Sequence, residues 1–277
     1  MRRLPGDDVA ARGAARLKTT GIATRIRRIA RLTLHIVGAL ALGAFVFPFV
    51  DSARHAWHVK RWSARFIRIL ALRIEVTGTL PRRGGPPAMI VANHVTWLDI
   101  FALNAAHPVR FVANSEIRRW PLLGWIAHIA RSLFIDQHRR HHVADINRQV
   151  EAGLRAGDTF AVFPEGGVND GETLRAFHAS LLQPALACDA LLHPVAIRYV
   201  RADGSRCREV AYDGDKTMLD VLRVILTQPV IHARLEFLPP IACSGRTRRD
   251  LAAEAQALIA RAVISSLDAH TSRTRHH

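Results

Sequence analysis

The sequence is short of cysteine, aromatic residues and acidic residues. Its 277 residues include only three cysteines, Cys188, Cys207 and Cys243, which are far apart and form no CxxC pair. A disulfide framework and a zinc finger are therefore excluded, and a reducing compartment is expected. Aromatic residues make up only 6% of the chain, but hydrophobic residues make up 49%. That apolar fraction is enough for a sizeable core and excludes a disordered or collagen-like chain.

Basic residues outnumber acidic ones: the chain has 39 Lys and Arg and 23 Asp and Glu, which gives a formal net charge of +16. Residues 1–83 carry +13 of this charge and residues 84–277 carry +3. A basic chain can indicate a nucleic-acid-binding protein. Here the charge brackets an apolar segment, and no recognised nucleic-acid motif is present. We therefore expect anionic membrane lipids, and no nucleic acid, as partners of the basic third.

A long uncharged segment lies inside this basic third. Leu32–Val50 has 19 residues, of which His35 is the only titratable one. This length is close to the ~20 apolar residues that cross a hydrocarbon core. Its late start and the lack of a small-residue cleavage site disfavour a secretory signal. A buried core helix would also be apolar, but the flanking arginines favour a retained membrane segment.

The next stretch, Ala53–Ile74, interleaves apolar and aromatic residues with basic ones, as an interfacial amphipathic helix does. Five basic residues lie in the fifteen positions before the uncharged segment and four in the fifteen after it. The positive-inside rule therefore does not determine the orientation of the segment in the membrane. We predict a helical hairpin over residues 32–74 that dips into one leaflet, with a bend at Gly38, Gly43 or Pro48.

From Gly84 onward, short apolar runs alternate with longer helical patterns. This alternation predicts an α/β domain with a largely parallel sheet flanked by helices. The predicted strands are 88–92, 109–113, 133–135, 159–163, 193–199 and 233–237. The predicted helices are 98–106, 122–131, 143–155, 179–187, 217–226 and 248–267. The predicted units are a basic, flexible N-terminal segment (1–31), the membrane-associated hairpin (32–74) and the α/β domain (75–277).

One strand-to-helix junction carries a histidine and a carboxylate. The run MIVANHVTWLDIF places His94 at a strand end and Asp99 in the first turn of the next helix, with Thr96 as the helix cap. Asp99 can hold one imidazole nitrogen and leave the other free, as the base and orienter of a catalytic triad do. No serine or cysteine nucleophile is evident, so the base would activate a substrate hydroxyl. The HxxxxD pattern alone is equally compatible with a structural pair.

A second junction, TFAVFPEGGVNDG, has an acid beside two glycines. Phe163 ends a predicted strand, Pro164 redirects the chain, and Glu165 precedes Gly166 and Gly167. Glycines let backbone amides approach a ligand closely, and an acid at a strand end is a candidate ligand-binding group. Turn formation alone would also account for the motif. Active sites of α/β domains gather at such strand-to-loop junctions.

In their order, these motifs resemble the glycerolipid acyltransferase family, which includes the 1-acylglycerol-3-phosphate (lysophosphatidic acid) acyltransferases. NHVTWLD is similar to the family's NHxSxxD signature, and SLFIDQHRR, FPEGGVNDG and HPVAI resemble its later blocks, over residues 53–241. The resemblance implies an α/β acyltransferase fold behind a membrane-dipping helix pair. It also implies acyl transfer from an acyl-CoA or acyl carrier protein co-substrate to a lysolipid hydroxyl, with no further cofactor.

The resemblance also implies roles for individual residues. His94 is the general base, Asp99 stabilises its imidazolium, and Glu165 organises the acceptor headgroup. Arg139 and Arg140 hold a phosphate, although a solvated charge run with the neighbouring histidines would look the same. No carboxylate or thiol stands at a metal-ligand spacing from those histidines, so no metal site is expected. The other predicted substrate-binding residues are Asn93, Phe163, Pro164, Gly166 and Gly167.

Two departures from the family pattern bear on the acceptor. Gln137 stands where the second block usually has an arginine, and Gly167-Val168 replaces the usual Thr-Arg or Thr-Thr. A phosphate would then be held by Arg139, Arg140 or Arg175. We expect lysophosphatidic acid as acceptor, giving phosphatidic acid; the alternatives are a lyso-ornithine or other aminolipid, or a catalytically silent lipid-binding relative. The expected location is the inner membrane, with the catalytic domain facing the cytoplasm.

Overall fold

A mixed β-sheet forms the centre of the molecule. The computed structural model describes residues 19–119, 121–136, 140–171, 173–212 and 216–274. Within them the strand order is β1-β7-β6-β2-β5-β3-β4, and β8 pairs with β6. The five strands from β6 to β4 run parallel to one another, whereas β1 and β7 run together in the opposite direction. The strands are β1 (Leu72–Gly78), β2 (Ala88–Ala92), β3 (Arg110–Asn114), β4 (Leu133–Ile135), β5 (Phe160–Val162), β6 (Leu191–Val200), β7 (Ile231–Phe237) and β8 (Ile241–Ala242).

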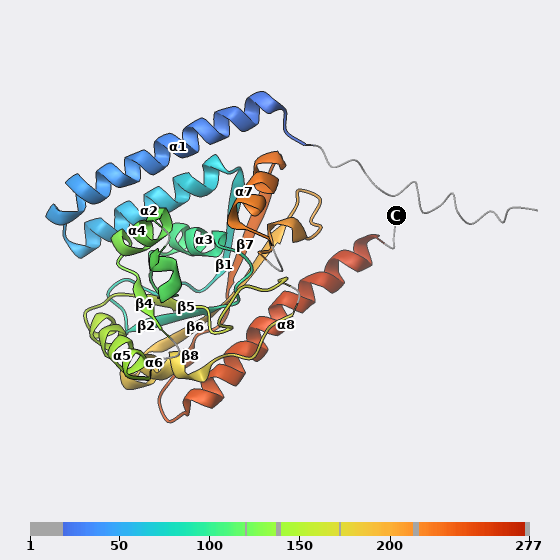
Figure 1. Ribbon diagram of the computed structural model, residues 1–277. Coiled ribbons are helices and arrows are strands. Elements are labelled where there is room, and N and C mark those ends of the chain that lie inside the picture. The colour runs from blue at the N-terminus through green and yellow to red at the C-terminus, as the bar shows by residue number, and fades with distance from the viewer. Residues whose placement is uncertain (1–18, 120, 137–139, 172, 213–215, 275–277) are drawn as a thin grey trace, which may run out of the picture.

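Helices cover both faces of this sheet, so the predicted α/β fold with a largely parallel sheet is confirmed (Figure 1). One face carries α2, α3, α4 and α7, with α1 outermost, and the other carries α5, α6 and α8. The helices are α1 (Ile22–Phe45), α2 (Ser52–Ile69), α3 (Leu98–Ala106), α4 (Pro121–Ile129), α5 (Arg140–Arg155), α6 (Gln183–Ala187), α7 (Met218–Thr227) and α8 (Arg248–Thr274). Short 3₁₀ turns lie at Phe47–Phe49, Ser115–Arg119, Ala179–Leu182 and Arg208–Val210.

The core lies on both faces of the central strands. In β2, Ile90 packs into the cluster that contains Leu98 of α3, whereas Met89 and Val91 pack into the cluster that contains Leu251 of α8. All five residues of β2 are buried. A strand buried on both faces is apolar at every position, which explains why the continuous run AMIVA was recognisable in the sequence.

The N-terminal hairpin differs in detail from the prediction. α1 begins at Ile22 rather than near Leu32, and it runs through Gly38 and Gly43 without interruption. The chain reverses at the 3₁₀ turn that contains Pro48. The proline ring is compatible with the start of a helical turn but not with the interior of a long helix.

The second helix of the hairpin is shorter than predicted. α2 is capped by Asp51, whose carboxylate accepts the Arg54 N–H at 2.8 Å, and it ends at Ile69. Ala71 then adopts a left-handed conformation, with φ of 59°. The predicted helix Ala53–Ile74 is therefore wrong at its end, because Leu72–Gly78 forms the edge strand β1, which the sequence did not predict.

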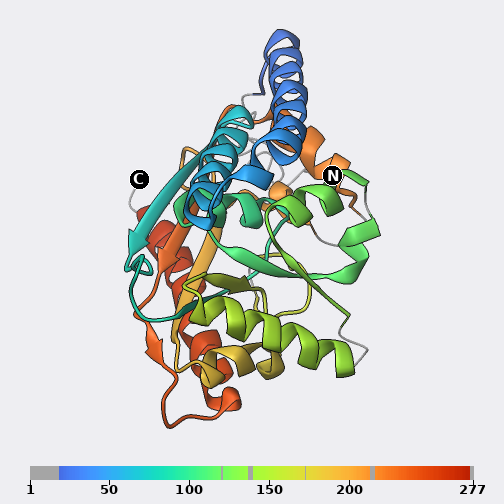
Figure 2. The same ribbon diagram turned by 90° about the vertical axis from the view of Figure 1, so that its left-hand side faces the viewer.

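Polar contacts hold α1 on the rest of the protein. The Arg28 guanidinium donates to the carbonyl oxygens of Leu226, in the last turn of α7, and of Gln228 and Pro229, which follow the helix. The His35 ring stacks on Trp62 of α2, with ring centroids 4.8 Å apart. Figure 2 shows that α1 nevertheless extends beyond the other elements. Within the described chain, Ile22–Phe49 is the one helical segment long and apolar enough to cross a membrane, and only 11% of its most apolar window is buried.

Candidate active site

The loop after β2 is fastened to the neighbouring strand β6. Asn93 is buried, and its side-chain oxygen accepts the Ile197 N–H at 2.7 Å while its NH₂ group donates to the Ile197 carbonyl at 3.0 Å. Both halves of the Asn93 amide are therefore engaged with backbone. In this structure Asn93 orients the start of the catalytic loop.

His94 and Asp99 meet as the sequence predicted. The His94 Nδ1 and the Asp99 Oδ2 are 2.8 Å apart, and the Asp99 side chain is fully buried. The same Oδ2 accepts the N–H groups of Val95 at 2.7 Å and Thr96 at 3.0 Å. With Nδ1 directed at Asp99, Nε2 is the nitrogen available to a substrate.

Thr96 does not cap the following helix, so that prediction is wrong. α3 begins at Leu98, after Trp97, and the Thr96 hydroxyl has no hydrogen-bond partner among the described residues. Asp99 binds the Thr96 N–H instead, so the loop is closed by the Asp99 carboxylate rather than by the threonine hydroxyl. The sequence rule for helix caps assumes a side chain that is free to reach the first turn.

The loop after β5 clamps the backbone of His94. Glu165 Oε1 accepts the His94 N–H at 2.8 Å, and the Asn169 N–H donates to the His94 carbonyl at 2.9 Å. The other oxygen of Glu165 accepts the Arg175 N–H at 2.9 Å and the Asn169 side-chain NH₂. Phe163 stacks on the imidazole, with centroids 4.0 Å apart and planes 11° apart. These contacts fix both the position and the ring plane of His94.

Glu165 lies inside the protein and is only 3% exposed. Burial raises the pKa of its carboxyl group, although the donated hydrogen bonds oppose that shift. Both carboxylate oxygens are occupied by groups of the chain itself. Glu165 therefore joins the loop after β2 to the loop after β5, and Asn169, which the sequence analysis did not single out, contributes to the same connection.

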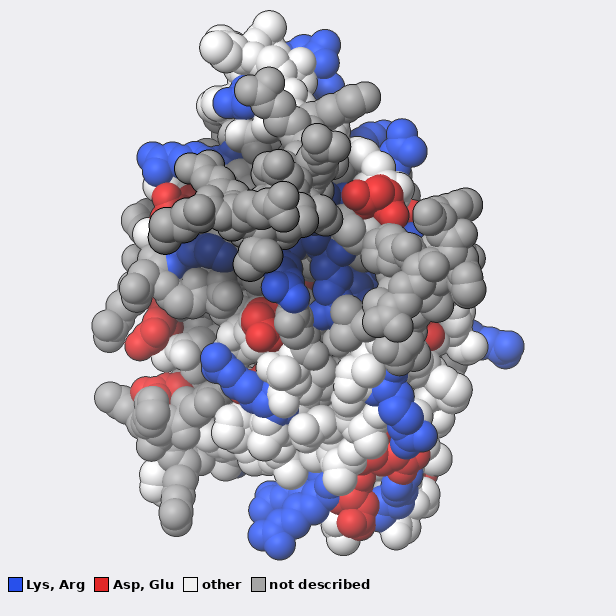
Figure 3. All heavy atoms as spheres, turned by 90° about the vertical axis from the view of Figure 1, so that its right-hand side faces the viewer, with Lys and Arg blue, Asp and Glu red and all other residues white. Residues whose placement is uncertain are grey.

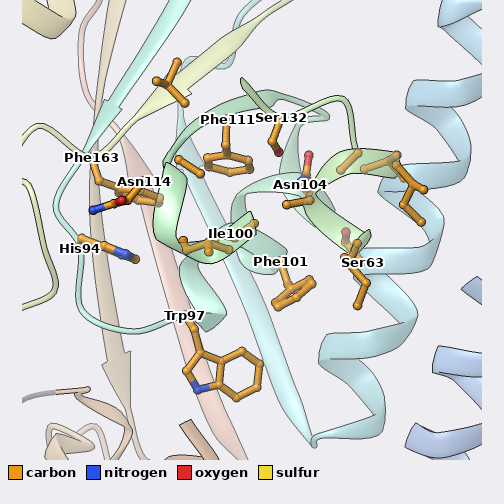
Figure 4. Close-up of a pocket in the computed structure, with 18 of the residues that line it drawn as sticks. Ser63, His94, Trp97, Ile100, Phe101, Asn104, Phe111, Asn114, Ser132 and Phe163 are labelled. Atoms are coloured by element: carbon orange, nitrogen blue, oxygen red, sulfur yellow. The ribbon is translucent and has the colours of Figure 1, made fainter. Parts of the chain in front are cut away.

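An apolar pocket of about 410 Å³ leads away from His94. Figure 4 shows Phe163 beside the histidine, Ile100 and Phe111 next to them, and Phe101, Asn104 and Ser63 further along. The pocket is also lined by residues of the N-terminal hairpin: Ala39, Leu42, Phe47, Val59 and Trp62. Its mouth, defined here as the end beside His94, is bounded by Gly166, Gly167, Val168 and Tyr212.

Some predicted binding residues cannot be placed at the mouth. Arg139 and Gln137 lie outside the described residues, and Arg140 begins α5 with a side chain that is not described. Pro164 accepts the His178 N–H through its carbonyl at 2.8 Å, which helps to close the loop that contains Glu165. Gly166 has φ of 74°, a conformation that favours glycine.

A histidine held by a buried carboxylate, with an apolar pocket on its free side, is suited to transfer an acyl chain to a hydroxyl group. The carboxyl ends of the parallel strands β2, β3 and β5 bring these parts together. The fold and the site therefore define an α/β acyl-transferring enzyme.

Comparison with known proteins agrees with this class. Residues 73–198 match the Acyltransferase family. The chain is 36% identical over 238 residues to a lyso-ornithine lipid O-acyltransferase of Pseudomonas aeruginosa, which covers 83% of this chain and 89% of that protein. It is 35% identical over 150 residues to a 1-acyl-sn-glycerol-3-phosphate acyltransferase of Neisseria meningitidis, which covers 54% and 58% respectively. The chain belongs to the Acyltransferase family and is an O-acyltransferase.

The crystal structure of the 1-acyl-sn-glycerophosphate acyltransferase PlsC from Thermotoga maritima has the same fold. It superposes with a TM-score of 0.63 and covers 87% of this chain and 96% of that chain, at 18% sequence identity.

Proposed function

We propose that this chain transfers a fatty acyl chain from a thioester to the hydroxyl of a lysolipid, and that the preferred acceptor is a lyso-ornithine lipid. The observation that carries the proposal is the position of the His94–Asp99 pair at one end of the 410 Å³ apolar pocket. The pocket can hold an acyl chain with its carbonyl carbon beside the free imidazole nitrogen.

In the proposed reaction, His94 Nε2 takes the proton of the acceptor hydroxyl while the hydroxyl oxygen attacks the thioester carbonyl. Asp99 stabilises the imidazolium that forms. The C–S bond then breaks, and the imidazolium returns its proton to the leaving thiolate, so that an ester and a free thiol result. The lipid hydroxyl is the nucleophile, so the reaction needs no acyl-enzyme.

Two charged side chains near the mouth favour a zwitterionic headgroup. A Cβ atom at Gly167 would lie 3.4 Å from Arg175 Nη1, so the guanidinium lies beside the glycine loop. Glu116 follows β3 at the same edge of the sheet, is exposed and lines the pocket. The carboxylate and the ammonium of an ornithine headgroup can pair with Arg175 and Glu116, whereas a phosphate would be repelled by Glu116.

The similarity to relatives supports the same choice. The lyso-ornithine lipid O-acyltransferase of Pseudomonas aeruginosa is matched over 89% of its length, whereas the Neisseria meningitidis enzyme is matched over 58%. Lysophosphatidic acid, the acceptor expected from the sequence motifs, is the second candidate. Arg175 supports it as a cation that could bind a phosphate.

The proposal is tested by acylation assays of the purified protein in detergent, with both acceptors at the same donor concentration. We expect faster turnover of the lyso-ornithine lipid. Glu116→Gln should raise the KM of that acceptor but not of lysophosphatidic acid, and Glu254→Gln on α8 is the matched control. Acylation of lysophosphatidic acid without acylation of the lyso-ornithine lipid would overturn the choice of acceptor.

For the acyl donor, we propose an acyl-CoA or an acyl carrier protein thioester, both of which are anionic. Lys and Arg side chains gather in a hollow on the side of the molecule that Figure 3 shows. On this side Arg206 donates to the carbonyl oxygens of Gly171 and Val263, each at 2.9 Å. Such a surface attracts anions and loses its effect as salt rises. Donor KM values should therefore rise with ionic strength, and kinetics with the two donors at equal concentration will identify the preferred one.

We further propose that the α1–α2 hairpin lies in one leaflet, with the α/β domain on the cytoplasmic side of the membrane. The exposed side chains of α1 include Ile22, Leu34 and Phe45, next to Arg27 and Arg31. Apolar residues flanked by arginines suit a leaflet with anionic headgroups. Labelling of single cysteines introduced at surface positions of the α/β domain, in sealed inside-out vesicles, tests the orientation.

A further inference from the structure

Tyr199 reaches the catalytic pair from a strand a hundred residues away in the sequence. It lies near the end of β6, is 4% exposed, and donates its hydroxyl hydrogen to Asp99 Oδ1 at 2.7 Å. It does not line the pocket. Within the part of the chain that the structure describes, the Tyr199 hydroxyl contacts the candidate site through Asp99.

The hydrogen bonds of Asp99 are divided between its two oxygens. Oδ2 faces the His94 Nδ1 and the N–H groups of Val95 and Thr96, whereas Oδ1 accepts from Tyr199. The Asp99 side chain is fully buried. A buried carboxylate with one unpartnered oxygen is strongly disfavoured, and among the described residues Tyr199 is the one hydrogen-bond donor to Oδ1.

The tyrosine hydroxyl is a stable donor in this place. Burial, and then the neighbouring Asp99 charge, raise the pKa of Tyr199 well above its usual value of 10. The phenol therefore stays protonated at every pH at which the enzyme would work. It can only donate to Asp99 and does not compete with His94 for the proton of the acceptor.

Strand β6 holds the loop that contains His94 and Asp99 at two positions that are two residues apart. Ile197 is bonded to Asn93 through its backbone, and Tyr199, two residues further on, is bonded to Asp99. Residues two apart in a strand point to the same side of a sheet. The strand thus fixes both the start of the loop and the carboxylate that follows it.

We propose that Tyr199 is a positioning residue of the catalytic pair, which holds the Asp99 carboxylate with Oδ2 toward His94 and stabilises its charge while the imidazolium exists. The inference rests on the acyltransferase activity of the chain and not on the choice of acceptor. Tyr199 touches neither substrate in this scheme, so its removal should affect the chemical step and leave substrate binding unchanged.

Tyr199→Phe removes only the hydroxyl. We expect kcat to fall about tenfold, with the KM values of donor and acceptor unchanged, for whichever lysolipid the wild type acylates. In an Asp99→Asn background the same substitution should cause no further fall, because Tyr199 acts through the Asp99 carboxylate. Tyr199→Met is a second variant without the hydroxyl. A similar fall in kcat in both variants would show that the loss of the hydroxyl, and not a packing effect of phenylalanine, is the cause.

Val200→Ala is the control for general loosening of β6, because Val200 is buried in the same strand and has no bond to the catalytic pair. It should lower the thermal midpoint and leave kcat unchanged. Wild-type kcat in both Tyr199 variants would overturn the proposal. An equal fall in kcat in the Asp99→Asn background, or in Val200→Ala, would also overturn it. If the wild type acylates neither lysolipid, the proposed acceptors fail, and the same comparison is made with the acceptor that is turned over.

Discussion

At the scale of single residues, the imidazole of His94 is restrained by side chain and backbone together. Asp99 holds Nδ1, Phe163 lies against the ring, and Glu165 and Asn169 bind the His94 N–H and carbonyl. Each restraint comes from a different point in the sequence. Proton transfer depends on such geometry, because a general base must lie within hydrogen-bond distance of the proton that it removes.

The first prediction concerns the general base. His94→Ala should reduce acyl transfer by at least ~100-fold, since general-base assistance is typically worth ~100- to 10,000-fold. Asp99→Asn should also lose much of the rate by releasing the imidazole from its productive orientation. Circular dichroism of both purified variants checks that the fold is retained. Full activity of His94→Ala would remove this residue from the mechanism.

The second prediction separates two roles for Glu165. Glutamine at this position places an NH₂ group against the N–H of His94 or of Arg175, so one donor loses its acceptor. Loss of a hydrogen bond to a charged group should destabilise the protein by about 1.5–3 kcal/mol. We expect kcat to fall while the acceptor KM stays near that of the wild type. A rise in acceptor KM alone would instead support the headgroup contact that the sequence motifs implied.

The third prediction uses the buried His107. Burial, with Lys60 and His193 nearby, lowers the pKa of His107 from 6.5 to about 4. The unfolded chain therefore binds this proton more readily between pH 6.5 and 4, and the folded state loses stability as the pH falls through that window. The loss amounts to about 3 kcal/mol. Denaturant unfolding at several pH values should show it, and His107→Gln should reduce it. The exposed His128→Gln is the control, and an equal effect in both variants would contradict the assignment.

The sequence predicted the His94–Asp99 pair because only four residues lie between its members, so that both are close to one strand-to-helix junction. Glu165 was recognisable for a similar reason, since it stands where a buried strand meets two glycines. Tyr199 was not recognisable, because its bond to Asp99 depends on strand order and register. Asn169 was not recognisable either, because its bond to the His94 carbonyl depends on how the two loops meet in space. The pairing of β2 with β6 aligns Ile90 with His193 and brings the end of β6 beside the catalytic loop. Neither the residues around Tyr199 (RYV) nor those around Asn169 (VND) indicate these long-range contacts.

At the scale of elements, the buried strands were the most predictable. β2 and β4 have the predicted bounds, β7 begins two residues earlier, and β3, β5 and β6 differ by one or two residues at both ends. The edge strand β1 was missed because its sequence, LRIEVTG, continues the mixture of basic and apolar residues that precedes it. A strand that is buried on one side only resembles an amphipathic helix over so few residues.

α1 has two functions, because it faces outward with exposed apolar residues and also forms part of the pocket wall. Ala39 is 3% exposed and lines the pocket, whereas Ala41, two residues later, is exposed. Helix periodicity places such neighbours on different faces. The helix that we propose to contact the membrane would therefore also limit the space for the acyl chain.

The fourth prediction follows from that wall. Ala39→Leu should fill part of the pocket and exclude the last methylene groups of a long acyl chain. At ~0.8 kcal/mol per buried methylene, the loss of two would lower kcat/KM for the longest donors about tenfold and spare the shorter ones. Ala41→Leu makes the same substitution on the exposed side and should leave the chain-length profile unchanged. Identical profiles for all three proteins would show that Ala39 does not limit the chain.

At the scale of the whole molecule, the charge and the apolar surface coincide in the N-terminal third. Arg28 is turned inward to the end of α7, whereas Arg27 and Arg31 are exposed. The exposed fractions of Leu34, Phe45 and Phe49 are 73%, 76% and 83%. Such side chains stabilise a membrane-bound state by burying apolar area, and the arginines add attraction to anionic lipids. Because α1 also forms part of the pocket wall, the proposed acyl-binding site lies next to this surface.

The fifth prediction tests this surface without removing the pocket wall. Deletion of residues 1–74 is not a clean test of membrane binding. It also removes the buried Ile67 and Leu70 and the start of β1, so the loss of membrane binding could follow from unfolding. Leu34→Glu with Phe45→Glu changes only exposed side chains, so the thermal midpoint should stay near that of the wild type. Binding to vesicles with anionic lipid, measured by sedimentation, should fall strongly, because two apolar anchors are replaced by carboxylates that the lipid repels. Leu219→Glu on α7, at a side chain that is 56% exposed, should sediment like the wild type. Undiminished sedimentation of the double variant would show that α1 is not the surface that meets the membrane.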